Sequence, residues 1–286
     1  MSLEMTSSAN PVPRPARLHL AGVPIDRFTM RDLLRWIASE LRSPSRQTRP
    51  LLVMGPNAHI VTTAQRSPEF RTALAAADLC VADGISILLA GLMLGQPIPE
   101  RVTGGDLMEQ LCALAARENL SVFFLGGLPG AAEGAASALE ARYPGLRVAF
   151  CCPPCRFEHD PVALATVLGT LHAAAPDILC VAIGVPRQEI WMNRHCPSLP
   201  IRLAISVGAA LDTQAGLRRR APKWTHNLGI EWAYRLAREP RRLWRRYLIG
   251  NTHFVLLVLA AWWQQRIHQQ PMPASTVQAQ QVAKQK

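Results

Sequence analysis

The sequence has no apolar run that could cross a bilayer. Its longest unbroken run, FVLLVLAAWW from Phe254 to Trp263, has about ten residues, whereas a transmembrane helix needs about twenty. The first residues, MSLEMTSSANPVPRPARLHLAG, also lack the apolar core and the small-residue cleavage site of a secretory leader. We therefore expect a cytoplasmic protein without a signal peptide, one that can lie on a membrane surface but cannot span it.

Motifs that bind metals are also scarce. No D-x-D triplet occurs, so the carboxylate pair with which many nucleotide-sugar transferases chelate a metal is not visible. Seven cysteines in a long chain favour free thiols over a disulfide framework. Cys152, Cys155 and His159 have a metal-like spacing, yet no second pair completes a tetrahedral site. We predict no bound metal and no cofactor.

Acidic residues are few relative to basic ones. The chain has 20 Asp and Glu against 31 Lys and Arg, a formal net charge of +11, and such an excess favours anionic partners without specifying a fold. Much of it lies in residues 218–254, where arginines alternate with tryptophans and tyrosines. Guanidinium groups pair with phosphate oxygens and stay protonated, while aromatic rings favour the headgroup level of a membrane. Three polyanions fit this segment: a diphosphate ligand, an acidic membrane surface or a nucleic acid.

The rest of the sequence alternates short apolar runs with longer alanine-rich ones, which is typical of βα units around a parallel sheet. The apolar runs are RPLLVMGPN, ADLCVADG, SVFFLGGLPG, LRVAF, PDILCVAIGVP and IRLAISVGAALD. We predict an α/β fold with a Rossmann-like parallel-sheet core sandwiched by helices. The predicted divisions are a disordered tail (1–17), the core (18–217), a helical basic and aromatic C-terminal appendage (218–268) and a second disordered tail (269–286).

Ligands in such sheets bind beyond the carboxyl ends of the strands. Polar and glycine residues follow several of the predicted strands and are expected to face one crevice there: Asn57, Asp83, Gly126, Gly127, Gly184, Gln188, Gly208 and Asp212. The segment FFLGGLPGAAEGAASAL predicts a strand, a glycine turn and a helix with Pro129 in its first turn. The amide groups of such a helix start bind phosphate well, although a plain tight turn is the commoner role of a glycine pair. The segment is not GxGxxG, which disfavours a dinucleotide oxidoreductase.

Asp83 directly follows an apolar strand in LCVADGIS. A carboxylate there would project into the crevice and could act as a general base, because partial burial raises its pKa while a nearby helix start favours its charged form. The alternative is that Asp83 caps the helix that begins near Ile85. The sequence leaves both interpretations open.

Eight ordered blocks together resemble the WecG/TagA/CpsF glycosyltransferases. The resemblance covers roughly residues 18–254, and the blocks are PNAHIV, ADLCVADGIS, PERVTGGDL, VFFLGGLPGAA, YPGLRV, PDILCVAIGVPRQEIW, SVGAALDTQAGLRRRAPKW and GIEWAYRLAREPRRLWRRY. It implies a membrane-associated, metal-independent, inverting transferase at the cytoplasmic face of the inner membrane. The implied donor is a UDP-sugar, and the implied acceptor is a sugar linked to undecaprenyl diphosphate.

The resemblance also implies roles for individual residues. Asp83 would be the catalytic base, and Asn57, Arg101 and Gln188 would line the donor pocket. Apart from the resemblance, we expect the helix start after Gly126 and Gly127 to help bind the donor diphosphate. The appendage would close over the site and bring arginines to the diphosphate, which assigns Arg235, Arg242 and Arg245 to that contact. A homo-oligomer is compatible with the resemblance.

One position departs from the family pattern. Many members have threonine two residues before the asparagine of the first block, and this chain has Gly55. With the very basic appendage, this departure favours glucosyl transfer in exopolysaccharide synthesis. The alternative is transfer of N-acetylmannosamine, as in teichoic acid or enterobacterial antigen synthesis. A nucleic-acid-binding α/β protein remains as an interpretation from another class, although no recognition helix or zinc finger accompanies the arginines.

Overall fold

The computed structural model describes residues 14–43, 49–219, 225, 231–238, 240–244 and 248–269. Its centre is a six-stranded sheet in the order β4-β3-β8-β7-β5-β6, in which every neighbouring pair is parallel. These strands are β3 (Leu51–Met54), β4 (Leu79–Cys80), β5 (Ser121–Gly126), β6 (Arg147–Cys151), β7 (Ile178–Ala182) and β8 (Leu203–Ser206). Each of the six apolar runs of the sequence forms one of them, so the predicted parallel α/β core is confirmed.

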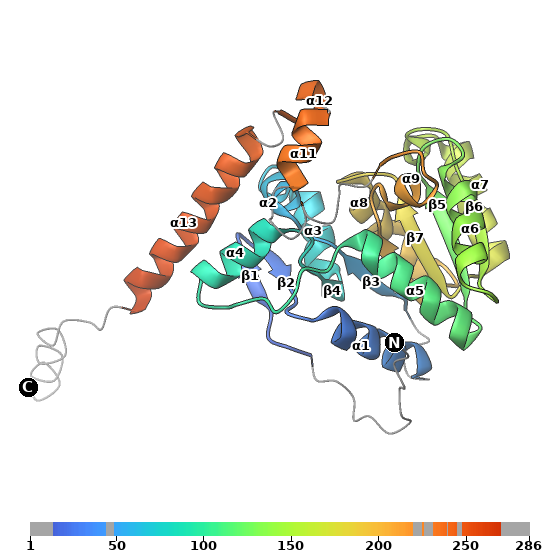
Figure 1. Ribbon diagram of the computed structural model, residues 1–286, viewed down its shortest axis with the longest axis horizontal. Coiled ribbons are helices and arrows are strands. Elements are labelled where there is room, and N and C mark those ends of the chain that lie inside the picture. The colour runs from blue at the N-terminus through green and yellow to red at the C-terminus, as the bar shows by residue number, and fades with distance from the viewer. Residues whose placement is uncertain are drawn as a thin grey trace, which may run out of the picture.

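Helices cover both faces of the sheet (Figure 1). Successive strand residues point to opposite faces, so Phe123 packs in one apolar core and Phe124 in the other. The first core is covered by α2 (Ala58–Ala64), α3 (Pro68–Ala76), α4 (Ile85–Met93), α7 (Pro161–Ala174) and α8 (Arg187–His195). The second is covered by α1 (Met30–Arg42), α5 (Gly104–Glu118), α6 (Ala131–Arg142) and α9 (Ala210–Gln214).

A two-stranded antiparallel sheet precedes the core and was not expected from the sequence. It consists of β1 (Leu18–Leu20) and β2 (Val23–Ile25), and its apolar side chains join the first core. Arg14 and Arg17, in the stretch expected to be a disordered tail, make ion pairs with Asp26 just after β2. The packed part of the protein therefore includes these two arginines. Residues 1–13 of that predicted tail lie outside the described residues.

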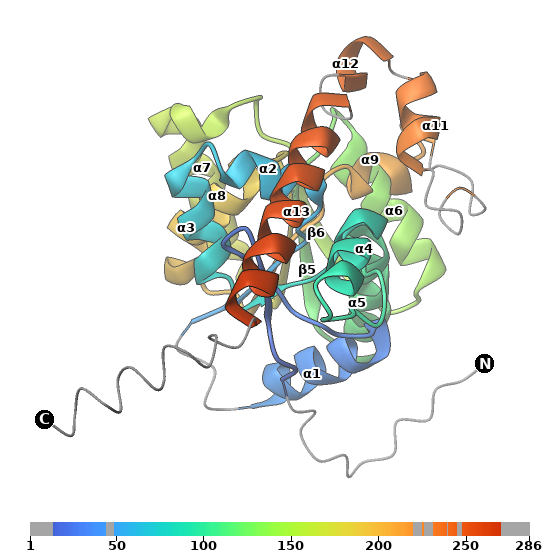
Figure 2. The same ribbon diagram turned by 90° about the vertical axis from the view of Figure 1, so that its left-hand side faces the viewer.

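The appendage is helical, as predicted, in the part that the structure describes. It contains α11 (Glu231–Arg238), α12 (Pro240–Trp244) and α13 (Gly250–Gln269). Helix α13 runs along the outside of the core and contacts α2 and α4 (Figures 1 and 2). Phe254 and Val258 face the first apolar core, whereas much of the opposite face of α13 is exposed. Among the helices of the described ranges, none is long and apolar enough to cross a membrane.

The start of α6 corrects one detail of the sequence prediction. Pro129 does not lie in the first turn of this helix, because α6 begins at Ala131 and is preceded by Gly130 in a left-handed conformation (φ 79°). A residue with positive φ cannot continue a right-handed helix. Pro129 and Gly130 therefore belong to the turn that connects β5 to α6.

Candidate active site

The parallel strands bring the predicted site residues to one edge of the sheet. Asn57 follows β3, Asp83 follows β4, Gly184 follows β7 and Gly208 follows β8, while Gly126 ends β5 and Gly127 comes directly after it. Since all six strands run in the same direction, these positions lie at their carboxyl ends, where α/β proteins bind ligands. The structure thus brings the candidates together, but the two halves of the edge differ in what their side chains do.

Asp83 lies in the half formed by β3 and β4. Its backbone N–H donates to the carbonyl of Pro56 at 2.9 Å, which ties the end of β4 to the end of β3. Helix α4 starts at Ile85 with Gly84 as its N-terminal cap, so Asp83 is not the capping residue. The capping interpretation left open by the sequence is therefore wrong. The Asp83 side chain is half-buried beside the start of α4, a position suited to a base that must meet a substrate.

Gly55 makes room for this carboxylate. A Cβ atom added at Gly55 would lie 3.3 Å from Asp83 Cβ and 3.6 Å from Asp83 Oδ2. A side chain at position 55 would therefore touch the Asp83 side chain. The departure from the family pattern at this position changes the immediate neighbour of the candidate base.

Asn57 completes this half of the edge. Its side-chain oxygen accepts the N–H of Ile60 at 3.2 Å and so caps α2. A Cβ at Gly84 would lie 3.5 Å from Asn57 Cβ, which shows how closely the exits of β3 and β4 approach each other. The predicted donor-pocket residue thus sits beside Asp83, and it is the amide nitrogen of Asn57 that we expect a donor to meet.

Arg101 approaches the same place from the loop before α5. The N–H of its neighbour Val102 donates to the carbonyl of Ala82 at 3.0 Å, so the loop is bonded to the residue that precedes Asp83. Arg101 is itself half-buried. The structure thereby brings a cation predicted for the donor pocket to the β4 end of the sheet.

Gln188 belongs to the other half of the edge and is turned inward. It is only 3% exposed, its Oε1 accepts the N–H of Gly184 at 3.3 Å, and its Nε2 donates to Glu189 Oε1 at 2.7 Å. Both ends of the amide therefore hold the turn between β7 and α8. The role of Gln188 in the donor pocket stays a prediction.

Glu189 is a buried carboxyl group that the sequence analysis did not single out. It is 0% exposed, and burial raises its pKa from 4.5 to about 7 despite the hydrogen bonds from Gln188 and Ser206. Its Oε2 atom has no hydrogen-bond partner within the described part of the chain. Nothing in the neighbouring residues PRQE indicates that this glutamate is buried, because acidic residues are common and exposed at helix starts. The sequence alone therefore does not predict its burial.

The glycine turn after β5 is also packed tightly. Gly126 and Gly127 have φ values of 96° and 86°, and a Cβ at Gly126 would lie 2.8 Å from Ile183 Cγ2. The N–H of Gly127 donates to Ala182 O at 2.9 Å, and that of Leu128 donates to Asp212 Oδ1 at 2.9 Å.

These bonds bear on the predicted phosphate contact. The amides of Gly127 and Leu128 are occupied within the protein, and the Asp212 carboxylate is 5% exposed and paired with Arg218 at 3.3 Å. This favours the tight-turn interpretation of the two glycines. The contact of Gly126 and Gly127 with the donor phosphates stays a prediction.

The appendage arginines are only partly described. Arg235 lies in α11 and Arg242 in α12, but the positions of their side chains are not described, and Arg245 lies outside the described residues. Both views place α11 and α12 at the same end of the molecule as α9, which follows the carboxyl end of β8 (Figures 1 and 2). Their assignment to a diphosphate stays a prediction.

The cysteines of CCPPC are spread over the surface beside the glycine turn. Cys152 and Cys155 are exposed, and the Cys152 thiol donates to Gly127 O at 3.8 Å. In the residues that the structure describes, no group of three or more His, Cys, Asp or Glu side chains could hold a metal ion. The geometry therefore offers no partner set that would turn the Cys152, Cys155 and His159 spacing into a metal site.

Comparisons with known proteins identify the family of the chain. Residues 18–268 match the glycosyl transferase WecG/TagA/CpsF family. Relatives in Staphylococcus aureus strains MRSA252 and MW2 are each named N-acetylglucosaminyldiphosphoundecaprenol N-acetyl-beta-D-mannosaminyltransferase. Each is 30% identical over 232 residues, which cover 80% of this chain and 88% of the relative. The resemblance seen in the sequence is thus confirmed: the chain belongs to the WecG/TagA/CpsF family and is a glycosyltransferase.

Proposed function

We propose that the protein transfers N-acetylmannosamine from a UDP-linked donor to N-acetylglucosamine on undecaprenyl diphosphate. The relatives carry this activity in their names. The observation that carries the proposal in this chain is the position of Asp83. It lies half-buried at the carboxyl edge, next to the exits of β3 and β4, and does not serve as a helix cap.

The proposed reaction is a single displacement. Asp83 takes the proton from an acceptor hydroxyl as that oxygen attacks the anomeric carbon of the donor sugar. The bond between the anomeric carbon and the β-phosphate oxygen breaks, and UDP leaves from the opposite face, so the configuration inverts. One carboxylate is sufficient, because no covalent enzyme intermediate forms.

Charge develops on the departing diphosphate and needs cationic partners. Preorganised donors at such a position are each worth roughly 3 to 4 kcal/mol in a dry site. The sequence has no D-x-D triplet, so we assign this role to arginines. Arg101 is the described candidate, and Arg235, Arg242 and Arg245 of the appendage are the further ones.

The donor sugar is assigned differently from the first expectation. The sequence favoured glucose, largely because of Gly55, whereas the named activity of the relatives favours N-acetylmannosamine. The structure also weakens the argument from Gly55. A side chain at position 55 would face Asp83, so this position bears on the base rather than directly on sugar choice.

The acceptor lipid stays in a membrane, and the exposed face of α13 suits a membrane surface. We infer that α13 and α4 together lie on an anionic bilayer as a peripheral contact. Arg266, whose guanidinium carbon lies 4.9 Å from the centre of the Trp262 ring, would reach the headgroups. The exposed apolar side chains of the two helices are Leu89, Leu92, Met93, Val255, Leu256, Leu259, Trp263 and Ile267.

The test is a transfer assay with the purified full-length chain. The acceptor is N-acetylglucosaminyl polyprenyl diphosphate in detergent, and the donors are UDP-N-acetylmannosamine, UDP-glucose and other UDP-sugars, each with and without EDTA. We expect turnover with UDP-N-acetylmannosamine that EDTA leaves unchanged. Turnover with UDP-glucose alone would restore the exopolysaccharide interpretation, and loss of turnover in EDTA would overturn the metal-independent mechanism.

A further inference from the structure

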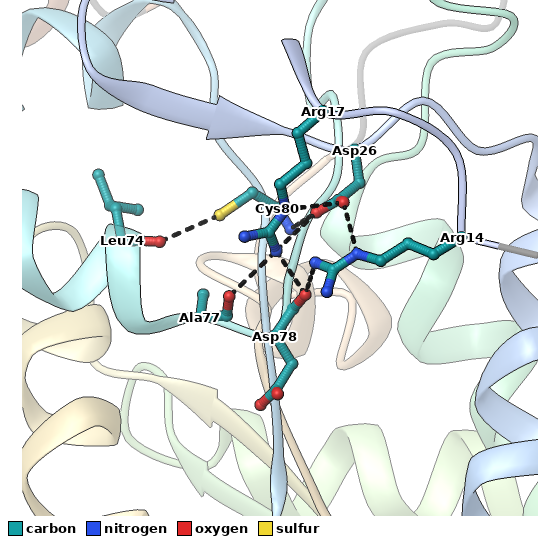
Figure 3. A network of polar contacts seen from close by, with 7 residues as sticks. All are labelled: Arg14, Arg17, Asp26, Leu74, Ala77, Asp78 and Cys80. Carbon is teal, nitrogen blue, oxygen red and sulfur yellow. Dashed lines mark hydrogen bonds and ion pairs between the residues drawn. The ribbon is translucent and has the colours of Figure 1, made fainter. Parts of the chain in front are cut away.

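Two arginines near the N-terminus contribute to a buried ionic cluster beside β4. Both turn their guanidinium groups toward Asp26, which is 1% exposed (Figure 3). Arg17 Nε and Nη2 lie 2.9 and 3.1 Å from Asp26 Oδ1 and Oδ2, and Arg14 Nε lies 3.2 Å from Oδ1. The buried carboxylate therefore has charged donors on both oxygens, which offsets the cost of removing it from water.

Asp26 also occupies the outer edge of β4. The N–H of Cys80 donates to Asp26 Oδ2 at 2.8 Å, and the N–H of Asp26 donates to Cys80 O at 2.7 Å. A parallel bridge joins Asp26 to Val81. Strand β4 has only two residues and pairs with β3 on its other side. A single residue thus makes the edge contacts that a further strand would otherwise make.

The same arginines hold the chain that leads into β4. Arg17 Nη2 donates to Ala77 O at 3.1 Å and also to Asp78 O, and Arg14 donates to Asp78 O as well. The Asp78 carboxylate accepts the N–H of Leu52 at 3.0 Å, which fastens it to β3. The entry into β4 is therefore fixed from both sides.

The exit from β4 leads directly to Asp83. The N–H of Val81 donates to Met54 O at 2.8 Å, and the N–H of Asp83 donates to Pro56 O at 2.9 Å. Together with the ionic cluster, these bonds tie the backbone of residues 77–83 to its surroundings. Since a misplacement of about 1 Å at a reacting group can cost on the order of 100-fold in rate, the position of this short strand matters for a base at its end.

We propose that Arg14, Arg17 and Asp26 form an electrostatic clamp that positions β4, and through it Asp83, for catalysis. They act as positioning residues, because they hold the backbone that carries the base and make no contact with the reacting atoms. Arg14 and Arg17 lie before the residues matched by the family model. This inference rests on the role proposed above for Asp83.

The test compares Arg17→Met and the double variant Arg14→Met/Arg17→Met with wild type in the full-length chain. Arg202→Met is the matched control, because Arg202 lies 3.1 Å from Asp177, whose carboxylate accepts the N–H of Ser121 at the start of β5. We expect kcat to fall about 10-fold in the single variant and about 100-fold in the double variant. The donor KM and the affinity for UDP should change less than kcat does, because Arg101 shares only the bond from Val102 to Ala82 with the backbone that the clamp holds.

Arg17→Lys provides a graded comparison. It keeps the charge but cannot reproduce the planar fork that reaches Asp26 and the two carbonyls, so we expect an intermediate kcat. If the double variant does not fold, Arg17→Lys and Arg17→Met still test whether the clamp affects kcat. The control Arg202→Met should lower the unfolding temperature while kcat stays at the wild-type value.

Hydrogen exchange tests the clamp without reference to activity. Amides of residues 77–84 should exchange faster in the arginine variants than in wild type, while those of β5 and β7 stay unchanged. Wild-type kcat in variants with a lower unfolding temperature would reduce the clamp to a stabilising role and overturn the proposal. If wild type transfers no sugar, the proposed function fails, and unchanged exchange at residues 77–84 would then separately overturn the clamp.

Discussion

The two halves of the carboxyl edge use their polar groups in opposite ways. Beside β5 and β7, Gln188 and Asp212 are buried and bonded to the turns around them. Beside β3 and β4, Asn57 and Asp83 are half-buried at the starts of α2 and α4. The polar groups of the first half therefore hold their own turns in place, while those of the second are the ones that we expect a substrate to meet.

The difference follows from how each strand leaves the sheet. The turn after β5 contains two glycines with positive φ, and its N–H groups need acceptors because it is packed against the β7 exit. Asp212 and the Ala182 carbonyl supply them. After β3 and β4, helices begin within a few residues, and the Asn57 side chain accepts one of the free N–H groups at the start of α2. Asn57 and Asp83 are half-buried there rather than fully enclosed, so we expect a substrate to reach them.

Asp83→Asn should produce the largest change in activity. Loss of a general base typically costs 10²- to 10⁴-fold, so we expect kcat to fall about 1000-fold. The amide is nearly isosteric, and the backbone bond from Asp83 to Pro56 does not depend on the carboxylate. Transfer rates and thermal unfolding of the same preparation check both points. Wild-type turnover in this variant would show that Asp83 is not the base. The β3 and β4 half of the edge would then have no demonstrated role in the reaction that the other half lacks.

Gly126→Ala tests the tightly packed half through stability. The new methyl would lie 2.8 Å from Ile183 Cγ2 and 2.9 Å from Ala182 O at a φ of 96°, so we expect unfolding free energy to drop by about 3 kcal/mol. Gly130→Ala is the matched control. Its φ is also positive, but no atom lies within 4 Å of the added Cβ, and strain alone should cost about 1 kcal/mol. If denaturant titrations show the same loss of unfolding free energy for both variants, close packing at Gly126 is not what destabilises Gly126→Ala.

Glu189→Gln tests the same half through pH. The folded-state pKa of Glu189 is raised from 4.5 to about 7, so the folded protein holds this proton more tightly than the unfolded chain does. The associated stability is fully present below pH 4.5 and is lost as the pH rises through 7. The difference amounts to about 3 kcal/mol. Glutamine cannot ionise, so the variant should lose less stability than wild type between pH 5 and pH 8.

Urea titrations at several pH values would measure this difference. The variant also places an amide NH₂ group where Glu189 Oε2 has no partner among the described residues, and that cost is independent of pH. Parallel stability curves for wild type and variant across pH 5 to 8 would contradict the raised pKa. Transfer activity at pH 7 should stay close to wild type, because the side-chain oxygen of glutamine can still accept the hydrogen bond from Gln188 Nε2.

The sequence predicts the parallel core well because its strands are short, continuous apolar runs that end in turn residues. It also places Asp83 correctly, since a carboxylate just past a buried strand must lie at the carboxyl edge. Contacts between residues far apart in the chain leave no such signal. The bond from Leu128 to Asp212, for example, joins positions 84 residues apart. Arg14 lies in a stretch whose composition is typical of a disordered tail, so the sequence does not predict its ion pair with Asp26.

Gly55→Ala and Gly55→Thr probe the reactive half with the smallest expected effect. Gly55 is buried, although its φ lies outside the left-handed region, so we expect the close contact of a new side chain to lower the unfolding free energy by about 1 kcal/mol. The methyl would press on Asp83 from 3.3 Å, and kcat should fall about threefold. Threonine adds a hydroxyl at the same point, so a difference between the two variants separates contact from hydrogen bonding. If both variants keep the wild-type kcat, a side chain at position 55 does not influence Asp83 as a base. The end of β3 would then affect the reaction as little as the turns after β5 and β7.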